Sequence, residues 1–362
     1  MYTETITLTS HVIPDEKTDA ILDKFDYPFT GETTVSINIP EFPKDFQIGI
    51  IVGSSGSGKT TILRKCFGED PVVRWSDDKA VISHFDTAEH GVDLLSAVGL
   101  SSIPTWCKPY NALSNGERFR ADVSRRLHSG AAIDEFTSVV NREAAKSCSF
   151  SIQKYIRKRN LTRIVFASCH KDIIEYLQPD WIYDTDTSQF YNGRYLCRPA
   201  IELILRTAAV DEWSVYKAHH YLSGSINRAS ICYVAELDGL PVCFVAVLAF
   251  PFKGCRNAYR ESRLVVLPDF QGIGIGNAVS ESVAEIYLAK GCRYFSKTTN
   301  PRCGEHRDNS PLWKGTSHNH KRRPDYVKNG TVRAKSKYTM SEEMQKIHAT
   351  RLCYSHEYIG GN

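Results

Sequence analysis

Residues 48–61 read Ile-Gly-Ile-Ile-Val-Gly-Ser-Ser-Gly-Ser-Gly-Lys-Thr-Thr, an apolar run that leads directly into a glycine-rich loop. The run is typical of a buried strand, and the residues after the loop can continue as a helix whose N-terminus favours an anion. In the G-x-x-x-x-G-K-T pattern, backbone N–H groups encircle a phosphate, Lys59 neutralises it and Thr60 offers a hydroxyl to Mg²⁺. A plain glycine and serine turn would explain the glycines but not the Lys-Thr pair. The stretch predicts a nucleoside triphosphate site formed by Gly53, Ser54, Ser55, Gly56, Ser57, Gly58, Lys59, Thr60 and Thr61.

Four further motifs follow the loop in a fixed order. They are Leu-Ser-Asn-Gly-Glu at 113–117, the acidic pair at 134–135, Thr-Ser-Val-Val-Asn at 137–141, and His170 at the end of an apolar run. With these motifs the N-terminal part resembles the ABC-type ATPases. Members of that family carry a phosphate loop, an LSGGQ-like loop that opens a helix, a Walker B acidic pair, a D-loop and a switch histidine in this order.

The resemblance implies roles for individual residues. Thr60 and Asp134 would hold Mg²⁺, Glu135 would polarise the attacking water, and His170 would contact the γ-phosphate. Residues implied to bind the nucleotide further are Ser114 and Gly116 of the LSGGQ-like loop and an aromatic that stacks on adenine, Tyr27 or Phe25. In this family the LSGGQ-like loop of one subunit completes the ATP site of another. Because the chain holds one copy of each motif, the resemblance implies a homodimer with ATP at its interface.

Three positions depart from the family pattern. Gly130–Ile133 is a weak apolar lead into the acidic pair, Asn141 stands where the D-loop usually has Asp, and His84 occupies the place of the Q-loop glutamine. Each departure touches a working part. The sequence therefore predicts nucleotide binding and leaves the rate of turnover open.

The composition predicts a globular protein. The chain has 362 residues, of which 42% are apolar and 24% charged, enough for two domains with full cores. The longest apolar stretch, Leu240–Phe252, contains two prolines and is too short to cross a bilayer. The eleven cysteines include no C-x-x-C pair, which favours reduced thiols over a disulfide framework or zinc ribbon. We therefore expect a cytoplasmic protein with no membrane partner.

A boundary between two domains is predicted near residue 200. Residues 179–194 read as a hairpin that closes the ATPase, and Arg198-Pro199 then interrupts the chain before an apolar helix predicted at 201–205. The predicted organisation is an ABC-type ATP-binding domain at 1–200, a linker at 201–210 and a second domain at 211–362.

The second half shows helical and strand patterns followed by another glycine loop. The predicted elements are a helix at 213–222, strands at 231–237, 242–250 and 262–266, a helix at 277–290 and a strand at 292–297. The loop before the later helix contains Gln-Gly-Ile-Gly-Ile-Gly at 271–276. Its successive amides can bind a pyrophosphate at a helix N-terminus. A dinucleotide site and a packed structural turn are the alternatives.

The loop follows an antiparallel meander and begins a Q-x-x-G-x-G pattern, which resembles motif A of the GNAT acyltransferases. The resemblance implies an α+β domain with a mixed, splayed sheet that opens between the strands at 262–266 and 292–297. Acetyl-CoA or another acyl-CoA would be bound by Val266, Gln271, Gly272, Ile273, Gly274, Ile275 and Gly276, with a backbone amide at Val266 or Leu267 polarising the carbonyl.

Candidate side chains for acyl transfer are His220 and Asn300. Further candidates are His219, Tyr221, Glu261, Asp269 and Ser310. His219 and His220 are also compatible with histidines on a helix face that have no catalytic role. The sequence assigns neither the base nor the acid of the reaction.

The segment 297–337 carries eleven lysines and arginines against three acidic residues, a net charge of +8. Trp313, Tyr326 and Tyr338 lie in or beside it, so it is suited to phosphate contacts and base stacking in DNA or RNA. A solvated basic tail without a ligand is the alternative. Together with scattered residues from Trp213 to Trp313, the segment faintly resembles the Mom-type branch of GNAT proteins, which modify adenine in phage DNA.

The leading hypothesis is an ATP-binding and hydrolysing module joined to a CoA-dependent N-acyltransferase that acts on a nucleobase amine. One alternative keeps both activities but makes the acceptor a protein or small-molecule amine. The other is an ATP-switched nucleic-acid clamp whose GNAT domain is inactive.

Overall fold

The computed structural model describes residues 2–25, 31–69, 72–194, 201–220, 225–322 and 352–361. The chain divides into two compact units, one formed by Met1–Ser101 with Thr105–Ala200, the other by Ser102–Pro104 with Ile201–Asn362. Tyr27, Tyr221 and the basic segment beyond residue 322 lie outside the described residues. Among the described helices, none has the length and apolar character that crossing a membrane requires.

The first unit contains a five-stranded sheet of order β4-β5-β3-β6-β7. Its strands are β3 (Ile48–Val52), β4 (Ala132–Ile133), β5 (Ile164–Ser168), β6 (Trp181–Asp184) and β7 (Gln189–Asn192). All neighbours are parallel except β6 and β7, which form the expected hairpin. Every residue of β3 and β5 is buried, as expected for parallel strands covered on both faces.

Helices cover both faces of this sheet. Up to residue 200 they are α2 (Lys59–Phe67), η1 (Val81–His84), α3 (Ala88–Ala97), α4 (Ile103–Trp106), η2 (Tyr110–Ala112), α5 (Asn115–Arg126), α6 (Arg142–Arg159) and α7 (Ile174–Leu177). Apolar residues of α3, α5 and α6 pack in one core with β3 and β5, and those of α2 pack in a second core with β3, β5 and β6. The strand and helix predicted around the phosphate loop are both confirmed.

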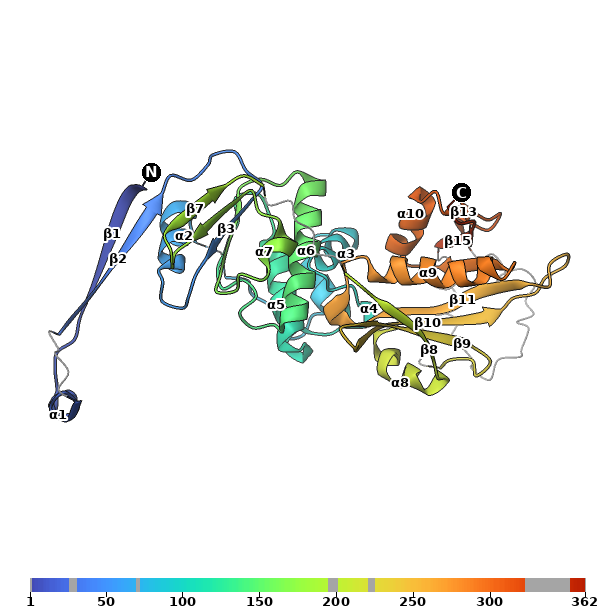
Figure 1. Cartoon of the computed structure of the whole chain (residues 1–362), viewed down its shortest axis with the longest axis horizontal. Helices are drawn as coiled ribbons and strands as arrows, with labels where there is room; N and C mark the ends of the chain where they lie inside the picture. The colour runs from blue at the N-terminus through green and yellow to red at the C-terminus, as the bar shows by residue number, and fades with distance from the viewer. Residues whose placement is uncertain are drawn as a thin grey trace. The chain divides into compact units, whose positions relative to one another are not determined.

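A separate two-stranded ribbon precedes the sheet. β1 (Tyr2–His11) pairs antiparallel with β2 (Glu32–Pro40), and α1 (Glu16–Phe25) lies at the far end of the ribbon (Figure 1). Ile37 and Ile39 of β2 join the core on the α2 side. The near end of the ribbon is thereby anchored to the sheet.

The second unit is built on an eight-stranded mixed sheet of order β13-β15-β12-β11-β10-β9-β8, with β14 paired to β15. Its strands are β8 (Ile204–Ala208), β9 (Ile231–Leu237), β10 (Leu240–Ala249), β11 (Ala258–Val266), β12 (Arg293–Thr298), β13 (Trp313–Gly315), β14 (Lys321–Arg322) and β15 (Leu352–Tyr358). Only the β11–β12 pair is parallel among the described strands of this sheet.

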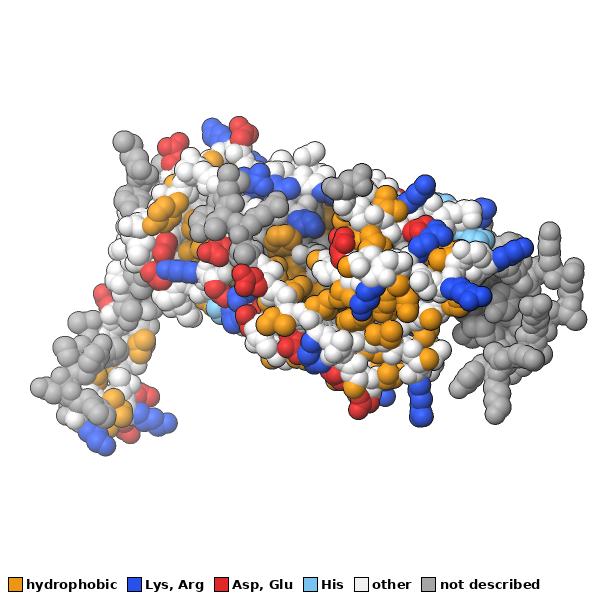
Figure 2. Space-filling view, turned by 45° about the vertical axis from the view of Figure 1, so that its right-hand side comes forward, with side chains coloured by type: hydrophobic (Ala, Val, Ile, Leu, Met, Phe, Trp, Pro, Cys, Tyr) orange, Lys and Arg blue, Asp and Glu red, His pale blue; other side chains and the backbone are white. Residues whose placement is uncertain are grey.

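Helices lie on both faces of this sheet as well (Figure 1). They are η3 (Val210–Glu212), α8 (Trp213–Tyr216), η4 (Lys217–His219), η5 (Pro268–Phe270), α9 (Ile275–Ala289) and α10 (Pro301–Asn309). Apolar residues of α9 pack against β9, β10 and β12, whereas Trp213 and Tyr216 of α8 pack against Phe244 on the other face. Figure 2 shows a face of the molecule on which apolar side chains gather, with Lys and Arg and with Asp and Glu side chains scattered around them.

Two predictions at the start of this unit are wrong. Residues 201–210 are not a linker, and no helix forms at 201–205, because Ile204–Ala208 pairs with β9 as the edge strand β8. Leu203 and Leu205 pack against the core, so the apolar run serves a strand. The helix expected at 213–222 is reduced to the short turns of α8 and η4.

Candidate functional site

The parallel strands of the first unit end at one edge of the sheet. Because β4, β5, β3 and β6 share one direction, the residues that follow them converge there. These are Gly53 after β3, Asp134 after β4, Cys169 and His170 after β5, and Thr185 after β6. The topology thus places the predicted phosphate loop, acidic pair and switch histidine at the same edge.

The phosphate loop needs its glycines for two different reasons. A Cβ on Gly53 would lie 2.0 Å from the Thr185 hydroxyl oxygen, and one on Gly58 would lie 2.5 Å from Ile37. Gly58 caps α2 with a φ of 90°, and Gly56 has a φ of 80° with open space where a side chain would stand. The loop can therefore bring backbone N–H groups close to an anion at the N-terminus of α2.

Side chains hold the loop in this shape. The Lys59 ammonium donates to the carbonyls of Gly53 and Ser54 at 2.9 and 2.5 Å. The Asp186 carboxylate accepts from the Ser54 N–H and hydroxyl at 2.8 and 2.7 Å, and these bonds lower the pKa of Asp186. The Ser57 and Thr185 hydroxyls are 2.6 Å apart. Asp186 and Thr185 were not predicted, although their place directly after β6, beside β3, would have indicated them.

A cavity of about 680 Å³ lies at the loop. It is lined by Thr9, Ser10, Ile37, Ser55, Gly56, Gly58, Lys59, Thr60, Thr61, Asp134, Glu135, Ser138, Val139, Ala167, Ser168 and Cys169. Loop, metal and acid candidates therefore share one space. Thr9, Ser10 and Ile37 come from the ribbon and were missed because a long antiparallel ribbon carries no local motif.

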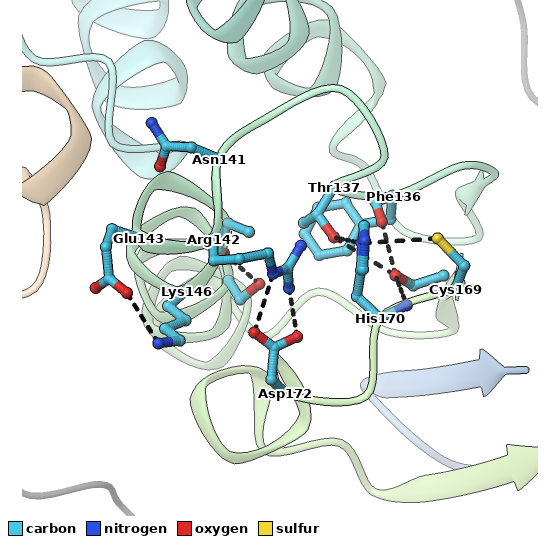
Figure 3. A network of polar contacts seen from close by, with 12 residues as sticks. Phe136, Thr137, Asn141, Arg142, Glu143, Lys146, Cys169, His170 and Asp172 are labelled. Carbon is cyan, nitrogen blue, oxygen red and sulfur yellow. Dashed lines mark hydrogen bonds and ion pairs between the residues drawn. The ribbon is translucent and has the colours of Figure 1, made fainter.

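His170, the predicted switch histidine, lies in a polar network with Phe136, Thr137 and Cys169 (Figure 3). The His170 ring nitrogen Nδ1 is 3.4 Å from the Thr137 hydroxyl, and the His170 N–H donates to Ser168 Oγ at 3.1 Å. Arg142 forms a two-pronged ion pair with Asp172 beside it. Burial, and next the charge of Arg142, lower the pKa of His170. The ring is therefore favoured in its neutral form, which can accept or donate one hydrogen bond.

The backbone of the acidic loop is left-handed at two residues that are not glycine. Glu135 has a φ of 51° and Thr137 one of 69°, and the Glu135 N–H donates to Asp134 Oδ1 at 2.8 Å. Such conformations are unfavourable for residues with a Cβ and occur often at active sites. Here they place Glu135 at the cavity while Thr137 reaches the histidine.

The LSGGQ-like loop lies apart from this cavity. Ser114 caps α5 through a capping box, accepting from the Glu117 N–H at 3.3 Å while Glu117 accepts from the Ser114 N–H at 2.9 Å. Burial would raise the pKa of Glu117, but these bonds and one from Thr105 lower it. Of the residues described here, neither exposed Ser114 nor Gly116 lines the cavity. The single chain therefore does not bring the LSGGQ-like loop to the phosphate loop.

Two departures from the family pattern have local structural roles. His84 accepts from the Ser76 N–H at 2.9 Å, and its other ring nitrogen is 3.0 Å from the Ala80 carbonyl. Asn141 caps α6 by accepting from the Ala144 N–H at 2.8 Å. Among the described residues, neither side chain lines the cavity.

In the second unit two parallel strands stop pairing partway along their length, and we call the unpaired region between them the gap. β11 and β12 pair from Ala258 with Arg293 to Glu261 with Ser296, after which each strand continues without the other. This matches the predicted splay, although β11 begins four residues earlier than the predicted strand. The glycine loop follows directly after the diverging end of β11.

The register of β10 and β11 decides which amide faces this gap. The Leu267 N–H donates to the Val242 carbonyl at 2.9 Å, so it is used within the meander. Because alternate residues of an antiparallel strand direct their backbone groups to opposite sides, the Val266 N–H is directed away from β10. Gln271 supports this site by donating from Nε2 to the Val266 carbonyl at 2.9 Å. Of the two amides predicted to polarise a carbonyl, Val266 fits and Leu267 does not.

The second glycine loop caps α9. Gly272 and Gly274 have φ values of 90° and 95°, and Gly274 is the N-cap of the helix with open space where a side chain would stand. A Cβ on Gly276 would lie 3.1 Å from Val266, so the helix packs closely on β11. Ile275 is buried in the core below it, and Ile273 packs against that core. The loop offers backbone amides at a helix N-terminus, which suits a pyrophosphate.

A buried ion pair lies where the two strands separate. Arg307 of α10 is 1% exposed and donates to Glu261 Oε1 at 3.0 Å and to Ser280 Oγ at 2.9 Å. Ser280 and Ser296 donate to the two Glu261 oxygens at 2.6 and 3.1 Å. Glu261 was considered as a base, but its carboxylate is occupied by structural partners. The network joins β11, β12, α9 and α10 at the start of the gap.

The two predicted catalytic side chains are accounted for differently. Asn300 is the N-cap of α10 and accepts from the Arg302 N–H at 3.0 Å, so its side-chain oxygen has a structural role. His220 is 9% exposed and packs edge-on against Trp213 at 5.6 Å, on the face opposite α9. Their catalytic roles remain predictions.

Comparison with protein families assigns the second unit. Residues 198–306 match the model of the acetyltransferase (GNAT) family. Comparison with curated proteins gives no match.

Solved structures with a similar fold are acetyltransferases at low identity. The ribosomal-protein-S18-alanine N-acetyltransferase from Escherichia coli is 11% identical, with 44% of this chain and 97% of that chain covered and a TM-score of 0.30. A GNAT family acetyltransferase from Brucella melitensis in complex with acetyl-CoA is 16% identical, with 27% and 76% covered and a TM-score of 0.23. One from Elizabethkingia anophelis with acetyl-CoA bound is 10% identical, with 44% and 98% covered and a TM-score of 0.27. The family match by itself indicates an acetyltransferase (GNAT) domain at residues 198–306.

Proposed function

We propose that the protein is an N-acetyltransferase that moves an acetyl group from acetyl-CoA to an amine of a nucleobase, under the control of ATP binding in the first unit. The observation that carries the acetyltransferase half is the gap between β11 and β12, which opens beside the Val266 amide and the glycine loop that caps α9. A family match over residues 198–306 supports it.

The residues at this gap fit acetyl-CoA. The open space at Gly274 and the amides from Gly272 to Gly276 suit its pyrophosphate, and the Val266 N–H is directed toward the side on which a thioester carbonyl would lie. Acetyl-CoA supplies an activated acyl carbon. In the transfer, the acceptor nitrogen forms a bond to that carbon, the carbon–sulfur bond breaks, and the proton lost by the amine balances the one gained by the departing thiolate.

Calorimetry tests the acetyl-CoA half. Titration of the wild-type protein with acetyl-CoA should show binding. DNA, RNA and protein substrates should then each be incubated with the wild-type protein and acetyl-CoA, and mass spectrometry should show an acetyl mass shift on a base. A shift on protein lysines alone would identify a protein acetyltransferase, and absence of acetyl-CoA binding would refute the proposal.

The ATP half rests on the shared cavity of the first unit. Lys59, Thr60, Asp134 and Glu135 line one space at the end of four parallel strands. Oxygen ligands from Thr60 and Asp134 suit Mg²⁺, and the Glu135 carboxylate at the same cavity suits the polarisation of a water. Ser114 and Gly116 lie apart from the cavity of their own chain. We propose that they contact ATP bound by a second copy, giving a homodimer.

Light scattering tests the dimer. Glu135→Gln should retain ATP without hydrolysing it, so this variant with ATP and Mg²⁺ should show twice the monomer mass. Adding Ser114→Arg should return it to monomer, because a large cation would replace the small cap of α5. A Glu135→Gln protein that stays monomeric with bound ATP would refute the ATP-clamped dimer.

A further inference from the structure

The turn that joins β10 and β11 carries a cluster of phenylalanines. Phe250 and Phe252 lie in the turn, and their ring centroids are 6.3 and 5.8 Å from that of Phe295 on β12. Phe250 is 38% exposed and Phe252 40% exposed. They are the two exposed phenylalanines among those whose side chains the structure describes. Exposed aromatic rings on a tight turn are a feature that packing alone does not explain.

Arginines lie over these rings. The Arg260 guanidinium carbon is 4.6 Å from the centroid of Phe250, and that of Arg293 is 5.4 Å from Phe252 and 5.1 Å from Phe295. Cation–π contacts keep planar cations and planar rings stacked at the surface. The arrangement offers two kinds of flat group to a ligand.

The charge around this cluster is positive. The turn itself, 250–257, contains Lys253 and Arg256, both exposed, and no acidic residue. Glu357 is the acid beside Arg293 and forms a two-pronged ion pair with it at 2.5 and 2.6 Å. Lys253 and Arg256 therefore give the turn a net positive charge.

The turn geometry keeps the aromatic rings together. Phe252 and Cys255 exchange backbone hydrogen bonds at 3.0 and 2.9 Å, and Gly254 has a φ of 90°. Phe250 donates its N–H to the Ala258 carbonyl at 2.7 Å. The cluster is therefore built on a closed hairpin end, which presents it without a large loss of conformational freedom on binding.

We propose that this cluster, Phe250, Phe252, Phe295, Arg260 and Arg293 with Lys253 and Arg256, binds single-stranded nucleic acid. Bases stack on the phenylalanine and arginine planes, and the two exposed cations of the turn contact phosphates. The alternative of an acidic protein partner would explain the exposed cations but not the exposed phenylalanine rings. Duplex DNA would bury its bases away from them.

Binding of single-stranded nucleic acid by this cluster would bring the proposed acceptor to the protein. The identity of the acceptor as a base of that strand rests on the proposed function. The cluster lies at the Ala258 end of β11, and the Val266 amide lies at its other end. A strand rises about 3.3 Å per residue, so the two are separated by roughly 26 Å of β11, a distance that several nucleotides span. The cluster would hold a strand while a neighbouring base reaches the gap.

Fluorescence anisotropy of a short fluorescein-labelled oligothymidylate, with ATP and acetyl-CoA omitted, tests the proposal. The wild-type protein should bind the single strand more tightly than the same sequence in duplex. Phe250→Ala and Phe252→Ala should each weaken binding by about 5- to 150-fold, the range for loss of one base stack. Lys253→Gln with Arg256→Gln should lower the slope of log affinity against log salt by about 1.4, since each phosphate contact on a single strand contributes about 0.7.

Matched controls exclude general effects. Tyr191→Ala removes an aromatic that is 54% exposed on β7, and Lys217→Gln removes an exposed cation of η4, so both should leave the affinity unchanged. Phe250→Leu and Phe252→Leu preserve apolar packing if the alanine variants unfold, and should still weaken binding.

Equal affinity for duplex, or single-strand binding that survives loss of both phenylalanines in a folded protein, would overturn the proposal. Because acetyl-CoA binding is measured separately by calorimetry, a failure of this surface is distinguishable from a failure of the acetyltransferase.

Discussion

The two glycine loops of this chain cap two helices in the same left-handed conformation but at the ends of very different strands. β3 is buried throughout and paired with β5 and β6 along its length, whereas β11 loses its partner β12 after Glu261. Lys59 follows the first loop directly, and the second loop is followed by Ile275. The first loop lies at a cavity that a cation, Lys59, and two acidic side chains also line. The second loop offers backbone amides at the N-terminus of α9 and lies beside the gap between β11 and β12.

The gap depends on the buried pair that marks its start, and this gives the largest expected effect. Glu261→Gln leaves Arg307 buried without its counter-charge and should lower the free energy of unfolding of the second unit by about 3 kcal/mol. Urea denaturation followed by circular dichroism measures the change. Replacing exposed Glu305 by Gln should change it little. Equal stability of the two variants would show that the pair does not hold the strands.

The chemistry of the second loop is tested by Gly274→Glu. The new carboxylate would stand in the open space at the N-terminus of α9 and repel a pyrophosphate, so acetyl-CoA affinity in calorimetry should fall at least about 100-fold. Gly291→Glu is a matched control, because Gly291 also has a positive φ and open space but lies beyond the other end of α9. A similar loss in both variants would indicate backbone strain as the cause.

The first loop should respond to loss of its cation instead. Lys59→Ala removes the ammonium at the phosphate loop and should weaken ATP binding by about 30-fold, equivalent to about 2 kcal/mol, while acetyl-CoA binding stays unchanged. Calorimetry with each ligand measures both. Lys158→Ala, at the exposed end of α6, serves as the control. Unchanged ATP affinity in Lys59→Ala would show that the first loop does not need its cation, and would contradict the proposed difference between the two loops.

A smaller effect on the free energy of unfolding is expected from Asp180, which binds the start of β3. Asp180 accepts from the N–H groups of Gln47 and Ile48 at 2.8 and 2.9 Å and from Arg157 at 2.8 Å. Burial would raise the pKa of Asp180, but Arg157 and the two N–H groups lower it below its ordinary value of 3.8. Its contribution is therefore present at neutral pH and is lost as the pH falls below that value.

Asp180→Asn should accordingly lower the free energy of unfolding by about 1–2 kcal/mol at neutral pH. The difference from the wild type should shrink when unfolding is measured in acid. A difference that stays constant with pH would show that the charge of Asp180 is not what stabilises the start of β3.

The first site could be predicted from the sequence because its parts are local. A β-branched run, a glycine loop and a Lys-Thr pair lie within fourteen residues of each other, and β3 and α2 formed where the pattern placed them. Thr185 and Asp186 escape prediction although they follow a predicted hairpin strand, because the pairing of β3 with β6 joins segments far apart in the sequence and no local pattern specifies it.

The second site depended more on long-range pairing. The amide that faces the gap is set by the register of β10 on β11, which no local pattern gives. The helix cap at Asn300 was readable, since Asn before Pro301 is a common start of a helix, but the residue was interpreted as catalytic instead. β8 was mistaken for a helix because a short apolar run carries no clear period.

The strand β15 has a consequence for how the protein is made. It lies between β12 and β13, although it comes long after them in the sequence. During synthesis, β12 therefore keeps an open edge until residues 352–358 have left the ribosome, and an open strand edge can pair with other chains. A chain that stops before this strand should aggregate, even though both glycine loops are already complete.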